Sequence, residues 1–155
     1  MRLWRLSSER RARAFDGGYG LSYDGRWNSK GRPVTYCSTG PSLATAEKRV
    51  HVADPGLLPP QVMVEYDVPD DIPLRALAIA DLPNDWPRRE VDTQKLGDAW
   101  LDAATEAVLL VPSVIVPIAD APDRNALVNH RHPAVARITI ARIVPFSLDP
   151  RLFRP

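Results

Sequence analysis

The sequence contains a single cysteine, Cys37, among its 155 residues. One cysteine cannot form a disulfide within the chain, and the N-terminal segment MRLWRLSSERRARAF lacks the apolar run of a signal peptide. Aspartate, arginine, proline or asparagine interrupts every hydrophobic run before it reaches the roughly 20 residues that a membrane-spanning helix needs. These absences predict a soluble, cytoplasmic protein without a membrane segment.

The sequence also lacks an excess of charge and the common nucleotide-binding motifs. Its 20 Lys+Arg and 19 Asp+Glu give a formal net charge of +1, whereas a strongly basic balance is the usual basis for predicting nucleic-acid binding. There is no GxGxxG loop and no GxSxG motif. The three histidines, His51, His130 and His132, have no metal-ligand spacing with cysteines or carboxylates. We therefore expect neither a metal site nor direct contact with nucleic acid.

Proline, by contrast, is abundant, with 16 residues spread along the chain. Because proline is excluded from helix interiors and from central strands, this density favours short strands and loops over long helices. A length of 155 residues that are 45% hydrophobic suits one globular domain with a real core. We expect a single domain over residues 1–155, of the α+β class, strand-rich and mostly antiparallel, with two helices.

Alternating apolar residues and turn residues predict where the elements lie. Helices are expected to begin near Pro41 and to cover residues 92–104, the latter with Leu96, Trp100, Ala103 and Ala104 on one face. Residues 14–32 are expected to form a glycine-rich loop and residues 120–133 an irregular loop. Strands are expected over residues 2–7, 33–38, 61–68, 107–113 and 136–148, with a further one at 74–79 that could pair with 61–68.

A glutamate lies on the inner side of the first expected helix. At about 100° per residue, Glu47 falls within the helix's apolar face. A carboxylate on the core side of a helix costs several kcal/mol unless donors or cations hold it. Glu47 is therefore expected at the edge of a cavity, paired with an arginine. The apolar face comprises Leu43, Ala46, Val50 and Ala53.

Two arginines are candidate partners for this carboxylate. Arg5 lies in a strand-like run, and Arg26 lies in a glycine-bearing loop that can approach a ligand closely. The planar fork of arginine suits a carboxylate or a phosphate. A simpler interpretation is a rim glutamate whose carboxylate reaches water. Likewise, Tyr36 at a strand end is typical of a core residue, Ser113 after Pro112 could simply end a strand, and Asn129 could simply satisfy backbone groups of its loop.

Four segments, LWRL, GRWNSKGRPVTYCSTGPSLATAE, VLLVPSVIVP and NALVNHRHP, occur in this order. Together they resemble the RES-domain toxins of RES–Xre toxin–antitoxin pairs. The resemblance covers most of the chain, and its most specific part is the block that joins GRWN, the tyrosine and the glutamate. The arginine, glutamate and serine that name the family would be Arg26, Glu47 and Ser113, with Arg5 and Tyr36 as additional pocket residues.

The resemblance implies a fold like that of bacterial ADP-ribosyltransferase toxins, and NAD+ as the substrate. Glu47 would then stabilise the oxocarbenium-like state that forms when the nicotinamide–ribose bond breaks. Arg5 and Arg26 would neutralise the pyrophosphate, and Tyr36 would stack on the nicotinamide. No metal or further cofactor is implied, because nicotinamide is already a leaving group. The remaining polar residues, Ser113 and Asn129, would donate hydrogen bonds to the dinucleotide.

Several questions stay open at the level of sequence. The acceptor of ADP-ribose could be water, phosphate or a host target protein, and the relative roles of Arg5 and Arg26 are undecided. Residues 52–100 match no motif, and the oligomeric state, homo-oligomer included, is not predicted. The resemblance also implies a helical, DNA-binding antitoxin of the Xre type that covers the pocket. The competing hypothesis is a non-enzymatic module that binds a nucleotide or a protein.

Overall fold

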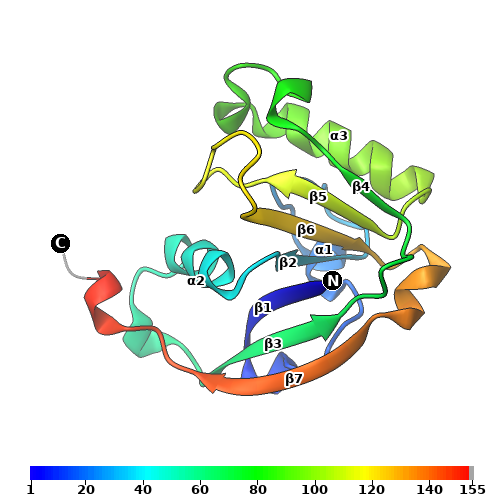
Figure 1. The fold of residues 1–155 in the computed structure, drawn as a ribbon. Helices are drawn as coiled ribbons and strands as arrows, with labels where there is room; N and C mark the ends of the chain where they lie inside the picture. The colour runs from blue at the N-terminus through cyan, green and yellow to red at the C-terminus, as the bar shows by residue number, and fades with distance from the viewer. Residues whose placement is uncertain (154–155) are drawn as a thin grey trace.

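A computed structural model describes residues 1–153. Seven strands form one mixed sheet in the order β4-β5-β6-β2-β1-β3-β7 (Figure 1), in which only β4 and β5 are parallel neighbours. This confirms the strand-rich, mostly antiparallel α+β class. The strands are β1 (Arg2–Ser8), β2 (Val34–Ser38), β3 (Gln61–Asp67), β4 (Leu74–Ala76), β5 (Val108–Pro112), β6 (Arg124–Asn129) and β7 (Thr139–Phe146), and the helices are α1 (Gly18–Ser22), α2 (Pro41–Val50) and α3 (Glu90–Ala103).

The sequence predicted six of these strands in place, namely β1, β2, β3, β4, β5 and β7. Two other expectations were wrong. Strand β4 pairs in parallel with β5 and not with β3, and the segment 120–133, expected to be irregular, contains the central strand β6. Its apolar run is only Ala126, Leu127 and Val128, flanked by polar residues and prolines, so local sequence resembles a loop. The glycine-rich loop also contains the short helix α1, which makes three α-helices in residues 1–153.

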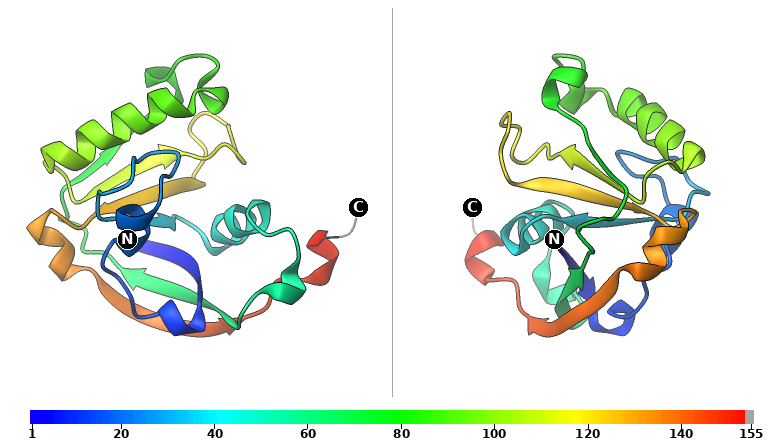
Figure 2. Two further views of the ribbon diagram at one scale, coloured as in Figure 1. Left: turned by 180° about the vertical axis from the view of Figure 1, so that it is seen from behind. Right: turned by 45° about the vertical axis from the view of Figure 1, so that its right-hand side comes forward.

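The sheet is divided where β1 and β2 meet. These two strands pair only between Trp4 and Ser38, whereas β1 pairs with β3 along its whole length. The sheet therefore consists of two parts, β4-β5-β6-β2 and β1-β3-β7, that separate beyond this pair. Figures 1 and 2 show helix α2 between the two parts, where it contacts β1 and β2.

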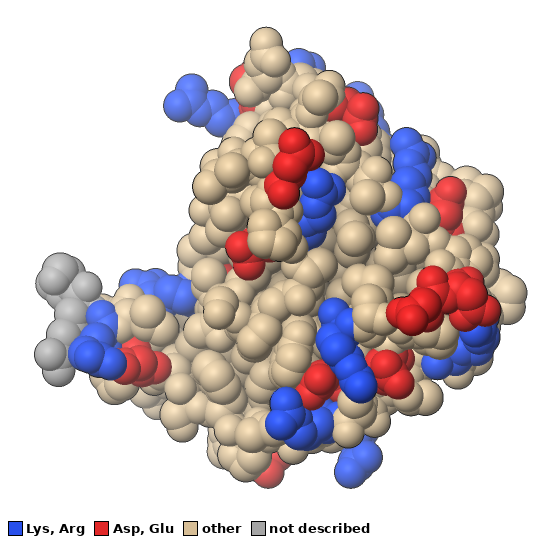
Figure 3. All heavy atoms as spheres, in the orientation of Figure 1, with Lys and Arg blue, Asp and Glu red and all other residues tan. Residues whose placement is uncertain are grey.

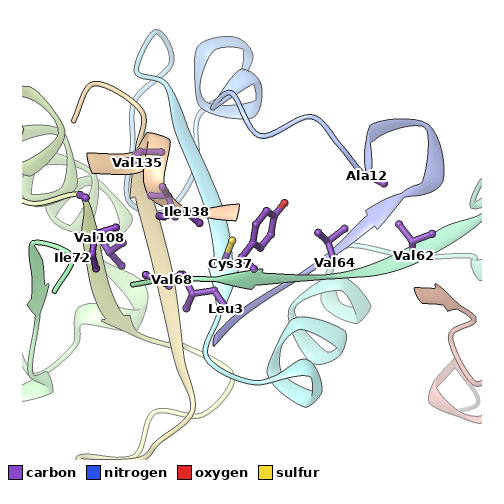
Figure 4. Packing of buried hydrophobic residues seen from close by; sticks show 14 residues of the cluster. Leu3, Ala12, Cys37, Val62, Val64, Val68, Ile72, Val108, Val135 and Ile138 are labelled. Atoms are coloured by element: carbon purple, nitrogen blue, oxygen red, sulfur yellow. The ribbon is translucent and has the colours of Figure 1, made fainter. Parts of the chain in front are cut away.

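Two large apolar clusters pack against the sheet, and only the first of them joins its two parts. One joins β1, β3 and the central strands, and includes Leu3, Cys37, Val64 and Val108 (Figure 4). The other packs α3 against β5, β6 and β2 through Trp27, Trp86 and Trp100. Burial of each large side chain contributes about 1.5 to 3 kcal/mol.

The inner faces of both main helices differ from the predicted ones. In α2, Leu43 and Ala44 are buried, while Val50 is 60% exposed because the end of the helix passes beyond the strands that cover its first turns. In α3, Trp100 is buried as predicted, but Ala103 is exposed, and the buried face consists of Thr93, Gly97, Trp100 and Leu101. None of the helices in residues 1–153 has the length and apolar character to cross a bilayer.

Candidate functional site

A cavity of about 930 Å³ opens between the two parts of the sheet. Because β1 and β2 diverge beyond their single pair, consecutive residues of both strands, 4–8 and 35–38, reach this space. Helix α2 closes one side, and the loop that carries Arg26 closes another. The volume lies toward the upper end of the range of small-molecule sites, about 300 to 1,000 Å³. The cavity is large enough for an extended ligand.

Glu47 lies at this cavity, held through one carboxylate oxygen. Its Oε1 accepts a hydrogen bond from the Ser113 hydroxyl, at 2.8 Å, and another from the Asn125 amide Nδ2. Both donors are themselves fixed, since Ser38 Oγ donates to Asn125 Oδ1 at 3.0 Å and the Ile115 backbone N–H donates to Ser113 Oγ at 3.0 Å. Glu47 Oε2 accepts no hydrogen bond from residues 1–153. One oxygen anchors the carboxylate, and the other is available to a ligand.

The expectation that an arginine pairs with Glu47 was wrong. Within residues 1–153, no arginine lies within ion-pair distance of this carboxylate. Two neutral donors on β6 and after β5 satisfy Oε1 instead. Because Glu47 is only partly buried, water at the cavity can solvate its charge, so no counter-ion is required.

The two predicted arginines nevertheless line the same cavity. Arg5 Nη2 donates to the carbonyls of Arg11 and Ala12, both at 3.2 Å, and its guanidinium lies 5.6 Å from the centre of the Tyr66 ring. Arg26 Nη2 lies 3.8 Å from Glu90 Oε2. Arg5 Nε and Arg26 Nη1 are buried without a partner among the described residues. Buried donors normally have partners. These two atoms have almost no accessible surface in this structure, so a ligand oxygen would reach them only if the side chains turned.

Tyr36 presents its ring to the cavity, while its hydroxyl binds the Arg26 loop. The hydroxyl donates to Asn28 Oδ1 at 2.7 Å and accepts from the Trp27 backbone N–H at 3.1 Å. Burial, the largest effect, raises the pKa of Tyr36 above its ordinary value. The side chain therefore stays neutral. Tyr19 meets the Tyr36 ring edge-on, at a centroid distance of 5.9 Å, so two aromatic rings lie at this end of the cavity.

Helix α3 supplies the support of this loop, which gives a role to part of the segment 52–100. Thr93 Oγ1 donates to the Arg26 carbonyl at 2.8 Å, and Gln94 Nε2 donates to the Gly25 carbonyl at 2.9 Å. A Cβ at Gly97 would lie 1.9 Å from the Trp27 carbonyl oxygen. Only glycine allows the helix and the loop to approach this closely.

Two of the predicted ligand-binding residues lie elsewhere than expected. Ser113 is fully buried and its hydroxyl holds Glu47, so it supports the carboxylate and does not line the cavity. Asn129 is also fully buried, does not line the cavity, and donates from Nδ2 to the Leu101 carbonyl at 3.0 Å. The structure therefore does not bring Asn129 to a ligand, because its amide is used to fix the end of β6.

Asn125 is the functional candidate that sequence reasoning missed. It lines the cavity and contacts Glu47, 78 positions earlier in the chain. Asn125 and Asn129 are four residues apart and share one face of β6, about 13 Å apart at strand spacing. That pattern becomes informative only if the segment is known to be a strand.

Comparison with known proteins places the chain in a family. The RES domain family model matches residues 2–149. "Toxin Res" of Yersinia enterocolitica is 31% identical over 155 residues, which covers 98% of this chain and 99% of that protein. "Toxin Res" of Pseudomonas putida is 34% identical, covering 99% of this chain and 100% of that protein. The "Prs ADP-ribosylating toxin" of a Sphingobium species is 32% identical, covering 97% and 96%.

Among solved structures, the fold matches a chain of the MbcT–MbcA toxin–antitoxin complex of M. tuberculosis. The TM-score is 0.73, with 20% identity, over 98% of this chain and 86% of that chain. This likeness shows the fold, and the sequence matches show the family. The chain belongs to the RES domain family.

Proposed function

We propose that this protein is the toxin of a toxin–antitoxin pair and that it breaks the nicotinamide–ribose bond of NAD+. One observation carries the proposal: the Glu47 carboxylate, anchored by Ser113 and Asn125, lies at a large cavity that Arg5 and Arg26 also line. The toxin names of the relatives, one of them ADP-ribosylating, support this assignment.

The anchored carboxylate suits the bond cleavage. When the bond between the nicotinamide nitrogen and C1′ of the ribose breaks, its electron pair goes to the ring nitrogen, and nicotinamide leaves as a neutral molecule. Positive charge develops on the ribose, and a preorganised carboxylate stabilises it. Glu47 Oε2 faces this charge or accepts the 2′-hydroxyl proton of the ribose in a hydrogen bond. Because hydrogen bonds already fix Oε1 before the reaction, the Glu47 carboxylate needs little reorganisation to reach the transition state.

The charges of the cavity orient the dinucleotide. The nicotinamide ring of NAD+ is cationic, and aromatic faces and carboxylates favour a cation. Tyr19, Tyr36, Asp24 and Glu90 line one end of the cavity, and burial, then Tyr23, Asp24 and Glu90, raise the pKa of Tyr19. We assign the nicotinamide to this end. The pyrophosphate then extends from Arg26, which borders this end, toward Arg5, since charge-assisted hydrogen bonds from planar guanidinium groups are strong.

An antitoxin that covers the cavity would keep this enzyme inactive. The rim next to Tyr19 carries exposed apolar side chains, with Leu21 48% and Tyr23 60% exposed. A helical, DNA-binding antitoxin of the Xre type is the proposed partner, acting by blocking the access of NAD+ to the cavity.

After cleavage, an oxygen or nitrogen atom of the acceptor forms a bond to C1′ of the ribose. The acceptor is water, phosphate or a host target protein, and its attacking atom loses a proton.

The test is incubation of the purified protein with NAD+, with and without phosphate, followed by chromatography and mass spectrometry of the products. We expect free nicotinamide, together with ADP-ribose, its phosphorylated form or a protein adduct, according to the acceptor. Glu47→Gln is the control, since it keeps the volume and removes the charge. NAD+ binding without nicotinamide release above this control would support the binding-module hypothesis instead.

A further inference from the structure

One end of the cavity carries cationic side chains that have no acidic partner. Arg11 and Lys48 line the cavity, next to His51, and neither of these two cations takes part in an ion pair within residues 1–153. On the face shown in Figure 3, groups of both signs are interspersed, and the whole sequence carries a formal net charge of +1. Unpaired cations in a cavity favour an anionic ligand.

The backbone brings the first of these residues to the start of β3. Arg11 belongs to the 3-10 helix η1 (Glu9–Arg11) that follows β1 directly. Ser8 pairs with Gln61, and the Glu9 backbone N–H donates to the Pro60 carbonyl at 2.8 Å. Arg11 therefore lies beside the first residues of β3, near the carbonyls that accept from Arg5.

Helix α2 brings the other two residues toward the same end. Ala44 packs in one apolar cluster with Leu6, and Leu58 packs against that cluster, so this helix face lies next to the segment that leads into β3. Lys48 is four positions after Ala44, and His51 is three positions after Lys48, which places all three on one side of α2. Lys48 and His51 follow Glu47 toward the C-terminal end of α2.

The opposite end of the cavity has the reverse character. Asp24 and Glu90 line it, and the only cation there within the described residues, Arg26, is paired with Glu90. The cavity thus has an acidic, aromatic end and a basic end, with Arg5 and Glu47 between them.

We propose that the basic end is a subsite for a phosphate group on the adenosine ribose, so that NADP+ is a better substrate than NAD+. The inference rests on the proposed function, in which Arg5 and Arg26 serve the pyrophosphate and the nicotinamide lies at the acidic end. Arg11 and Lys48 are then surplus to NAD+ itself. An arginine beside the adenosine ribose is a common means of accommodating the 2′-phosphate of NADP+.

The test compares kcat/KM for nicotinamide release from NADP+ and from NAD+. Removing one charge-assisted hydrogen bond lowers affinity by about 10-fold or more. Arg11→Gln and Lys48→Gln are each expected to lower the value for NADP+ by about 10-fold and to change the value for NAD+ by less than about 3-fold. Arg10→Gln and Lys95→Gln are matched controls, because both side chains are exposed and neither lines the cavity. Equal values for the two dinucleotides in the wild type would overturn the proposal.

A binding measurement separates failure of the subsite from failure of the proposed function. Calorimetry with adenosine 2′,5′-bisphosphate and with AMP should show tighter binding of the bisphosphate, and Lys48→Gln should remove that difference. If this result holds while neither dinucleotide releases nicotinamide, the subsite stands and the proposed function fails. The opposite result would be acceleration of NAD+ cleavage by inorganic phosphate in the wild type but not in Lys48→Gln, without tighter binding of the bisphosphate than of AMP. In that case the basic end binds the acceptor phosphate, and the proposal is wrong.

Discussion

Asn125 is expected to act on NAD+ cleavage through Glu47. Asn125→Leu keeps a similar volume but removes the amide that donates to Glu47 Oε1 and accepts from Ser38 Oγ. A hydrogen bond to a charged group contributes about 1.5 to 3 kcal/mol. If that energy serves to orient the carboxylate in the transition state, kcat for nicotinamide release falls by roughly 10- to 100-fold. KM should change little, because Glu47 acts mainly on charge that develops during the reaction.

A double-substitution cycle shows whether Asn125 works through Glu47. In Glu47→Gln the carboxylate is already absent, so adding Asn125→Leu should lower the rate little further. Ser38→Ala, which removes only the hydroxyl that orients Asn125, should lower the rate a few-fold. The assay is the initial rate of nicotinamide release, with chemical denaturation to confirm folding. A wild-type rate in Asn125→Leu, or full additivity with Glu47→Gln, would refute the reasoning.

Three further predictions concern the arginine, the loop support and a buried histidine. Arg26→Ala should weaken NAD+ binding roughly 10- to 100-fold by calorimetry, whereas Arg88→Ala, exposed and outside the cavity, should not; equal affinities would remove Arg26 from the site. Gly97→Ala should lower the free energy of unfolding in urea by about 1 to 3 kcal/mol, because its Cβ meets the Trp27 carbonyl oxygen; an unchanged value would contradict this close approach. Burial, which outweighs the opposing charge of Asp16, lowers the pKa of His130 from 6.5 to about 4, and the charge of Arg5 adds to this effect. The unfolded chain therefore binds the extra proton first, and the free energy of unfolding falls as pH drops through this range; His130→Gln should reduce that dependence, and an identical pH profile would count against it.

The expected partner of Glu47 shows where local reasoning stops. The helical period placed this glutamate on the inner side of α2, and the structure places it at the cavity. The helical period could not show which residues donate hydrogen bonds to Glu47. The arginine that was expected from charge alone does not pair with it within residues 1–153. Ser113 and Asn125 lie 66 and 78 positions away in sequence. Which donors satisfy a carboxylate depends on which strands become neighbours, and no local pattern records that.

The sequence by itself determined the positions of β1, β2 and β3 and the α+β class, because strand alternation and proline density act locally. The resemblance to the RES-domain toxins pointed to the motif residues Arg26, Tyr36 and Glu47. Only the tertiary structure decided that β6 lies between β5 and β2, and that β1 and β2 pair at one position and then separate. Strand order and divergence arise from long-range pairing and from the packing of α2 and α3, which no segment specifies alone. For that reason the sequence supplied the chemical groups of the cavity, while the fold alone supplied the cavity itself, its basic end and the anchor of Glu47.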